Sequence, residues 1–208
     1  AHADSSITVT NASEVIIYWV NATSFNGANK HPVNEGANYL ETATDDAWHT
    51  ANISYDEIRE RHVADYKRLY DRMKLQLGKQ EANLSKTTDE QLKSYTDNND
   101  NNTYLETLYT QYGRYMLISC SRTEGVPANL QGLWSPHLYS PWRGNYTINI
   151  NLEENYWPAE VSNLSEMVMP LESFISSMAA NGRMVASHYY GIHRGWCAGH
   201  NSDIWAMA

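Results

Sequence analysis

Asparagine and tryptophan gather in one stretch of the chain, residues 129–160, and chemistry is expected there first. Asn149 and Asn151 lie two positions apart between apolar residues. In an extended segment such a pair points to the same face of the strand, so two carboxamides would project side by side and hold a water molecule through their oxygens. The alternative, which the spacing leaves open, is a pair of asparagines that cap a turn or a helix.

The residues around this pair favour a sugar as the ligand. A carboxamide offers one acceptor and two donors, as the hydroxyls of a sugar require, and an indole ring covers the C–H face of a pyranose. Trp142 and Trp157 flank the asparagines, and we expect both to line a carbohydrate-binding cleft. The chain has 15 Tyr and 7 Trp but only 2 Phe, and aromatic rings with a polar tip suit such wet clefts. Ordinary half-buried core aromatics are the alternative.

Three carboxylates lie close to the same stretch. Glycoside hydrolysis needs two carboxyl groups across the scissile bond, so Glu153, Glu154 and Glu160 all deserve consideration. Their context is typical of the first turns of a helix, where acidic side chains simply favour the helix dipole. We therefore assign none of them a catalytic role from the sequence.

A second polar cluster runs from His200 to Asp203. His200 and Asp203 are three residues apart, which suits two ligands of a metal, but no third ligand is visible and no metal is expected. The mixture fits hydrogen bonding to sugar hydroxyls better, so His200, Asn201 and Asp203 are predicted to bind substrate, with structural capping as the alternative. No P-loop, Rossmann glycine pattern or nucleophile elbow indicates a cofactor.

Composition excludes some classes of partner. The formal charge of −9 argues against nucleic acid, whose phosphates require basic patches. No run approaches the roughly 20 apolar residues of a membrane span, so no membrane partner is expected. Cys120 and Cys197 belong to no metal-binding pattern, and we interpret them as two buried thiols.

The elements that must position these residues are mainly helical. Apolar and β-branched residues in 6–20 predict a β-hairpin, which needs partner strands that the polar stretch 26–50 does not offer. A capping box at Ser54 begins a predicted helix over 55–72. A short strand-like segment at 73–77 and a loop over 79–102 follow. Further helices are expected at 103–120, 152–161 and 165–190, with a kink at Gly182. Strands followed by helices argue for a β domain and an all-α domain.

Eight short blocks, in order along nearly the whole chain, carry a resemblance to a known family. They read RHxxDY (61–66), GRY (113–115), NLQGLW (129–134), YTININ (146–151), NYWPAE (155–160), NLSE (163–166), NGR (181–183) and HNxD (200–203). The chain resembles glycoside hydrolase family 95, whose members are inverting exo-α-L-fucosidases and α-L-galactosidases.

The resemblance implies an architecture. Residues 1–50 would be the last part of an N-terminal β-sandwich-like domain, 51–100 a helical linker and loop, and 101–208 the first helices of an (α/α)6 barrel. The chain is then expected to be an internal piece of a larger enzyme, extracellular or periplasmic. With its helix faces uncovered, it is expected to be poorly soluble alone.

The resemblance also implies a mechanism. The asparagines that match Asn149 and Asn151 hold and polarise the attacking water. The general acid, a Glu, and a supporting Asp are expected beyond residue 208, so the isolated chain should be inactive. An inverting enzyme leaves roughly 6.5–9.5 Å between its carboxyl groups for that water.

Thr147 departs from the fucose-preferring pattern, which has His at this position. The smaller hydroxyl side chain leaves space and a partner for the O6 of L-galactose, so the expected substrate is an oligosaccharide or polysaccharide with terminal α-L-galactose, or else α-L-fucose. Three alternatives remain: an α-1,2-L-fucosidase specifically, a non-catalytic carbohydrate-binding protein, and a structural helical domain.

Overall fold

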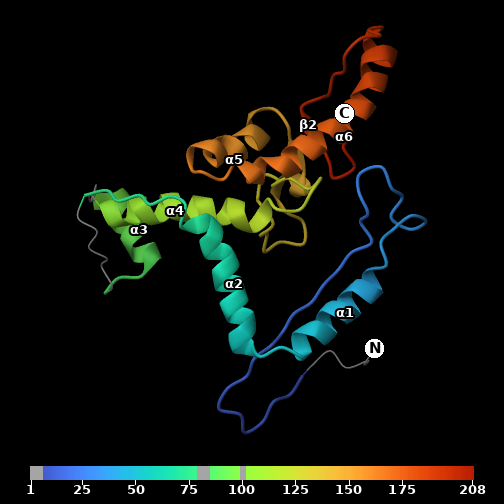
Figure 1. The fold of residues 1–208 in the computed structure, drawn as a ribbon. Coiled ribbons are helices and arrows are strands. Elements are labelled where there is room, and N and C mark those ends of the chain that lie inside the picture. The colour runs from blue at the N-terminus through green and yellow to red at the C-terminus, as the bar shows by residue number, and fades with distance from the viewer. Residues whose placement is uncertain (1–6, 79–84, 99–101) are drawn as a thin grey trace.

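The computed structural model describes residues 7–78, 85–98 and 102–208. This part is mainly helical (Figure 1), as the sequence predicts. Its helices are α1 (Tyr39–Ala51), α2 (Tyr55–Tyr70), α3 (Thr88–Asn98), α4 (Thr103–Cys120), α5 (Ile150–Val161) and α6 (Met169–Tyr190), with short 3-10 turns η1 (Pro141–Gly144) and η2 (Ser165–Val168). In the described ranges, the one β ladder pairs β1 (Tyr146–Thr147) with β2 (Asn201–Ser202) in antiparallel fashion.

The core lies where α4, α5 and the first half of α6 meet (Figure 1). α2 leads away from it toward α1, and the N-terminal segment follows the outside of the molecule. The central residues of the core are almost wholly buried: Leu69, Ile118, Ala159, Leu164, Phe174 and Ala206. Among the described residues, no helix has both the length and the apolar character that crossing a membrane requires.

α2 begins as predicted, at a capping box. The Ser54 hydroxyl accepts a hydrogen bond from the Glu57 amide, and Glu57 pairs with Arg61 one turn later. The helix ends at Tyr70, two residues before the predicted boundary. Local signals therefore define this helix almost completely.

Arg114 fastens α2 to α4. Its side chain is buried, and its guanidinium donates hydrogen bonds to the carbonyl oxygens of Leu69, Tyr70 and Met73 at 3.2, 3.0 and 3.3 Å. Helix ends leave carbonyl groups without intrahelical partners, and this arginine binds two of those of α2, together with the Met73 carbonyl just beyond the helix. The ring of Tyr66 also packs against Tyr115, with 5.9 Å between their centroids. Residues of the RHxxDY and GRY blocks thus meet at one helix junction.

The turn from α5 into η2 uses a left-handed residue. Asn163 has φ 58°, its amide donates to the Glu160 carbonyl at 3.1 Å, and the Leu164 amide donates to the Ala159 carbonyl at 2.9 Å. This is a Schellman arrangement, in which the residue after the turn packs apolar surface. Leu164 is fully buried, so the NLSE block directs the chain from α5 toward α6.

Gly182 does not kink the last helix, since α6 continues across it to Tyr190. A Cβ atom at this position would lie 2.7 Å from the Cys197 carbonyl oxygen and 2.8 Å from the Trp196 ring. The Gly182 carbonyl accepts a hydrogen bond from the Cys197 amide at 3.3 Å. The glycine therefore permits the segment that leads to His200 to lie directly on α6.

The predicted hairpin over 6–20 is wrong for the residues that the structure describes, because 7–20 form no strand. Their apolar side chains are largely exposed, and a hairpin without further partner strands is marginal in water. Residue 6 lies outside the described ranges. The strand-like segment 73–77 is also irregular. The β-forming residues of 7–20 therefore form no sheet in the described part of the chain.

Two helices were missed. α1 carries apolar residues at helical spacing (Leu40, Ala47, Trp48 and Ala51), and Asn38 caps it by accepting from the Glu41 amide at 3.3 Å, so its signal was present but was overlooked within the polar stretch 26–50. α3 lies within the predicted loop 79–102, of which 79–84 and 99–101 are outside the described residues. The Thr87 amide donates to the Glu90 carboxylate at 2.9 Å, half of a capping box that was readable in the sequence.

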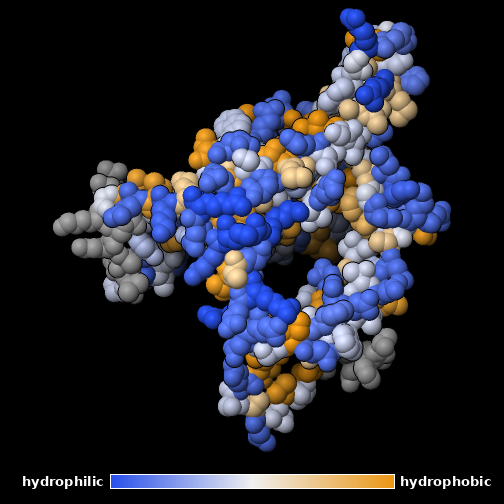
Figure 2. Space-filling view, viewed as in Figure 1, coloured by the Kyte–Doolittle hydropathy of each residue, from blue (hydrophilic) through white to orange (hydrophobic). Residues whose placement is uncertain are grey.

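The space-filling view shows apolar residues reaching the surface in several separate patches (Figure 2). Tyr109 on α4 and Tyr189 on α6 are 79% and 83% exposed.

Candidate functional site

The β1–β2 ladder joins the two polar clusters that the sequence separates. Thr147 lies opposite Asn201, and the Ile148 amide donates to the His200 carbonyl at 2.8 Å. The Thr147 hydroxyl donates to the Asn201 side-chain oxygen at 3.3 Å. Two predicted substrate-binding residues, 54 positions apart, are therefore in direct contact.

The other face of the ladder is anchored in the core. Tyr146 and Ser202 are buried; the Tyr146 hydroxyl donates to the Pro127 carbonyl at 3.0 Å and its ring packs on Phe174. The Ser202 hydroxyl donates to the Met207 carbonyl at 2.6 Å. Because neighbouring residues of a strand face opposite sides, this anchoring turns Thr147 and Asn201 outward.

Asn149 and Asn151 are not in an extended segment, so that prediction is wrong. Asn149 is the N-cap of α5, and its side-chain oxygen accepts a hydrogen bond from the Ile150 amide at 2.6 Å. Asn151 belongs to the first turn of the helix, where residues two apart do not share a face. Ile150, expected to point into the core, is 40% exposed. The capping alternative describes Asn149 correctly.

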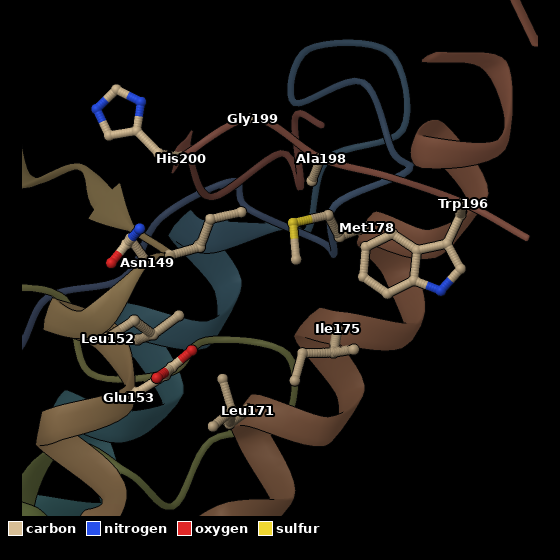
Figure 3. Close-up of a pocket in the computed structure, with 11 residues that line it drawn as sticks. Asn149, Leu152, Glu153, Leu171, Ile175, Met178, Trp196, Ala198, Gly199 and His200 are labelled. Atoms are coloured by element: carbon tan, nitrogen blue, oxygen red, sulfur yellow. The ribbon is translucent and has the colours of Figure 1, made fainter. Parts of the chain in front are cut away.

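A hollow of about 590 Å³ lies beside Asn149, between α5, α6 and the segment that leads to β2 (Figure 3). Its wall is apolar and is formed by Leu152, Leu171, Ile175, Met178 and Trp196. Three polar side chains stand around this wall, those of Asn149, Glu153 and His200. In Figure 3 the His200 imidazole projects outward from the rim. An apolar wall with a few polar groups is the usual make-up of a small-molecule site.

The two tryptophans predicted to line this cleft lie elsewhere. Trp142 is in η1, is 73% exposed and lines a separate hollow with Tyr139 and Arg143. Trp157 is on α5 and is 61% exposed. The structure therefore brings neither indole to the hollow beside Asn149. Helix α5 begins immediately after the ladder and turns Trp157 away, which the expectation of an extended segment did not anticipate.

Asp203 closes a turn. Its carboxylate accepts hydrogen bonds from the amides of Trp205 and Met207 at 2.9 and 3.4 Å. This is the structural capping role that the sequence left open. Of the second cluster, His200 lines the hollow and Asn201 contacts Thr147, while Asp203 shapes the backbone that follows.

Residues of the NYWPAE block form the frame behind the site. The Tyr156 hydroxyl accepts a hydrogen bond from the Ala128 amide at 2.8 Å and lies 2.7 Å from the Ser121 hydroxyl. The Asn155 carboxamide donates to the Asn129 carbonyl at 2.9 Å. Burial raises the pKa of the Tyr156 phenol, which therefore remains a neutral hydrogen-bonding group. α5 is thus fixed against the NLQGLW segment just before the ladder.

Two further side-chain predictions concern cysteine and metal. Cys120 and Cys197 are free thiols; Cys120 is buried, as predicted, and Cys197 only partly so. Burial raises the pKa of the Cys120 thiol. Within the described residues, no three His, Cys, Asp or Glu side chains form a group that could hold a metal ion.

Among the polar side chains that line the hollow, Glu153 is the one to which the sequence assigned no role in the site. The available signal was its spacing, because residues four apart on a helix share a face and Glu153 is four residues after Asn149. That signal applies only once helix α5 is known to begin at Ile150.

Known proteins resemble this chain over most of its length. Residues 54–208 match the family model of the glycosyl hydrolase family 95 catalytic domain. An Arabidopsis thaliana protein named Alpha-L-fucosidase 2 is 34% identical over 204 residues, which are 96% of this chain and 24% of that protein. Probable alpha-fucosidase A of Aspergillus niger is 34% identical over 174 residues, 83% of this chain and 21% of its own. The chain spans about a quarter of the length of these curated relatives.

Proposed function

The chain belongs to glycosyl hydrolase family 95, and from that membership we propose that it is part of an exo-acting glycoside hydrolase that removes a terminal α-L-fucose or α-L-galactose from glycans. The observation that carries the proposal is the β1–β2 ladder, which brings the Thr147–Asn201 pair beside the hollow that Asn149 and His200 line. Because the chain covers only a quarter of its relatives, the activity is proposed for the full-length protein.

The character of the hollow suits such a sugar. L-Fucose carries a methyl group and C–H faces as well as three hydroxyls. The apolar wall around Met178 and Trp196 matches the methyl group and the C–H faces. The polar side chains of Asn149 and Glu153 match the hydroxyls. A site with both characters binds a deoxy sugar better than it binds either a lipid or a highly charged ligand.

The proposed reaction proceeds with inversion. The proposal keeps Asn149 and Asn151 as the residues that position the attacking water, as the resemblance implies, although only Asn149 lines this hollow; a Glu general acid and a supporting Asp come from outside this chain. The Asn149 carboxamide, whose oxygen already accepts from the Ile150 amide, still offers a second lone pair and two N–H donors. The helix dipole at the start of α5 adds a positive field there, which favours a water that is losing a proton.

Two observations favour different sugars. The relatives are named as fucosidases, which favours L-fucose. Thr147 favours L-galactose, because its short side chain leaves room for the additional hydroxyl. The substrate is in either case a glycan outside the cytoplasm, so the proposal places the enzyme in the extracellular space or the periplasm.

The test is hydrolysis by the full-length protein of α-L-fucosyl and α-L-galactosyl substrates that share one leaving group. Release of the β-anomer of the sugar, followed by NMR in the first minutes, is expected from an inverting enzyme. Turnover of neither substrate, together with binding of the free sugar, would instead identify a non-catalytic carbohydrate-binding protein. Absence of both turnover and binding would leave only the structural role.

Thr147→His examines the choice of sugar. If Thr147 provides room for O6, this change should lower the ratio of galactoside to fucoside kcat/KM by roughly 10-fold to 100-fold. Thr147→Ser, which keeps the small hydroxyl, is the matched control and should leave the ratio within about 3-fold of the original. A wild-type enzyme that strongly prefers fucose would refute the argument from Thr147.

A further inference from the structure

We propose that Glu153 binds the terminal sugar directly, accepting hydrogen bonds from two of its hydroxyls. This proposal rests on the proposed function, since it specifies how the same hollow holds its ligand. Glu153 acts as a binding group and takes no part in proton transfer. The inference starts from the position of this carboxylate on α5.

Helix geometry places Glu153 with the other polar residues of the hollow. Asn149 is the N-cap of α5 and Glu153 follows four residues later, so both side chains occupy one face of the helix. Figure 3 shows the Glu153 carboxylate between Leu152 and Leu171, beside the space that Ile175 and Asn149 also border. The carboxylate therefore reaches the interior of the hollow as well as the solvent.

Its neighbour Glu154 provides the contrast. Glu154 has the same charge and also lies early in α5, yet it is not among the residues that line the hollow. The helix dipole acts more on Glu153, which lies in the first turn of α5, than on Glu154, so the comparison of the two acids needs a sugar-binding readout as well as a stability readout. Of the two acids, only Glu153 has a place opposite an apolar wall.

The chemistry of a carboxylate in this setting favours hydroxyl pairs. An ionised carboxylate only accepts hydrogen bonds, and its two oxygens suit two adjacent O–H donors of a pyranose. The apolar side chains of Leu171 and Ile175 opposite it offer a surface for the C–H face of the sugar whose hydroxyls the carboxylate would bind. A neutral ligand rich in hydroxyls is thus the class that this position selects.

The experiment compares Glu153→Gln, Glu153→Ala and Glu154→Gln in the full-length protein. Glu153→Ala is expected to raise KM by about 10-fold to 100-fold, the range for loss of hydrogen bonds to a charged group. Glu153→Gln keeps the shape but loses one acceptor oxygen, so its increase should be smaller. Glu154→Gln should remain within about 2-fold of wild type. The pH profile of kcat should be the same in all four proteins, because Glu153 transfers no proton.

Titration with free L-fucose and L-galactose provides a second readout, in which Glu153→Ala should weaken binding as strongly as it raises KM. Equal KM values for Glu153→Ala and Glu154→Gln would overturn the inference and leave the proposed function intact. Equal losses in Glu153→Gln and Glu154→Gln, accompanied by equal losses in Tm, would assign both acids to the helix alone. A wild-type protein that neither binds nor hydrolyses these sugars refutes the proposed function, and the inference with it.

Discussion

Asn149 has both a structural role, as a helix cap, and a proposed chemical role in the hollow. Its side-chain oxygen accepts from the Ile150 amide and so begins α5, while the same carboxamide stands at the rim of the hollow. Structural and chemical roles in one side chain are separable, because serine caps a helix as well as asparagine does but has no carboxamide.

Asn149→Ser should therefore keep the stability of the protein and lose most of its turnover, by about 100-fold or more if the carboxamide positions the water. Asn149→Ala removes the cap as well and should also cost about 1 kcal/mol of stability. The measurements are kcat on the preferred fucoside or galactoside and thermal unfolding of the same samples. Normal turnover in Asn149→Ser would remove this residue from the mechanism.

Asp65, also at the scale of single residues, forms ion pairs whose contribution to stability depends on pH. Hydrogen bonds from Arg122, at 2.6 and 3.0 Å, and then from Arg68 lower the pKa of the Asp65 carboxyl to about 2. Since the folded-state pKa lies below the unfolded value of about 3.9, the contribution is complete above pH 4 and is lost as the pH falls toward 2.

Asp65→Asn should accordingly lower stability at pH 6 by less than about 1 kcal/mol, because the pair is partly exposed and screened by solvent. The difference from wild type should shrink as the pH falls through 4 and 2 and disappear only at about pH 1, below both pKa values. Urea unfolding at several pH values measures it, with Asp56→Asn, at an exposed position of the same helix, as the control. A difference that is constant from pH 6 to pH 2 would contradict the assignment.

At the scale of elements, replacing glycine by alanine is expected to have opposite effects on stability in two helices. Gly182 in α6 lies against the backbone of Cys197, whereas Gly113 in α4 has no heavy atom within 4 Å of an added Cβ. Alanine is better than glycine in a helix by roughly 1 kcal/mol, so only the surroundings separate the two sites.

Gly182→Ala should destabilise the protein, because the segment 196–197 must move off α6 to admit a methyl group 2.7 Å from a carbonyl oxygen. We expect a loss of about 1–3 kcal/mol and, since that segment leads to His200, a weaker affinity for sugar. Gly113→Ala should gain up to about 1 kcal/mol. Unfolding by denaturant measures both, and a gain in both variants would show that the close approach at Gly182 carries no cost.

Local signals allowed α2 and α4 to be predicted, although similar signals at α1 and α3 were overlooked. Ser54 and Glu57 predict the start of α2, and the apolar spacing of 103–120 predicts α4, because these signals act within one or two helical turns. α1 shows helical spacing at Leu40, Ala47 and Trp48 although it buries no residue, and it was overlooked within a polar stretch. Of the residues that line the hollow, the sequence singled out Asn149 and His200; it also singled out Thr147 and Asn201, which meet in the adjoining ladder. It could not place Trp157, whose direction depends on where α5 begins, or Trp142, which lies in η1 with φ 57°.

For the whole molecule, Arg114 joins the part of the chain near the N-terminus to the part that holds the site. It donates to the carbonyl groups of Leu69 and Tyr70 at the end of α2 and of Met73 just beyond it, and burial lowers the pKa of its guanidinium. The segment before α4 is thereby oriented relative to the core around α5 and α6.

Arg114→Met should cost about 2 kcal/mol or more, since it removes a charged donor and leaves buried carbonyl oxygens without it. Arg114→Lys keeps the charge but lacks the planar fork, and an intermediate loss is expected. Denaturant unfolding of the full-length protein gives both values. An effect of Arg114→Met below about 0.5 kcal/mol would show that water or other groups replace the guanidinium.

The small ladder between Thr147 and Asn201 also has a consequence for the order in which the protein assembles. Its partners are 54 residues apart, so the ladder forms only after α5 and α6 have shortened the intervening chain. Exchange of the Ile148 amide hydrogen with deuterium, which the His200 carbonyl protects, should therefore report late folding and early local opening of the hollow. Sugar that binds there should slow this exchange before it slows exchange in α4.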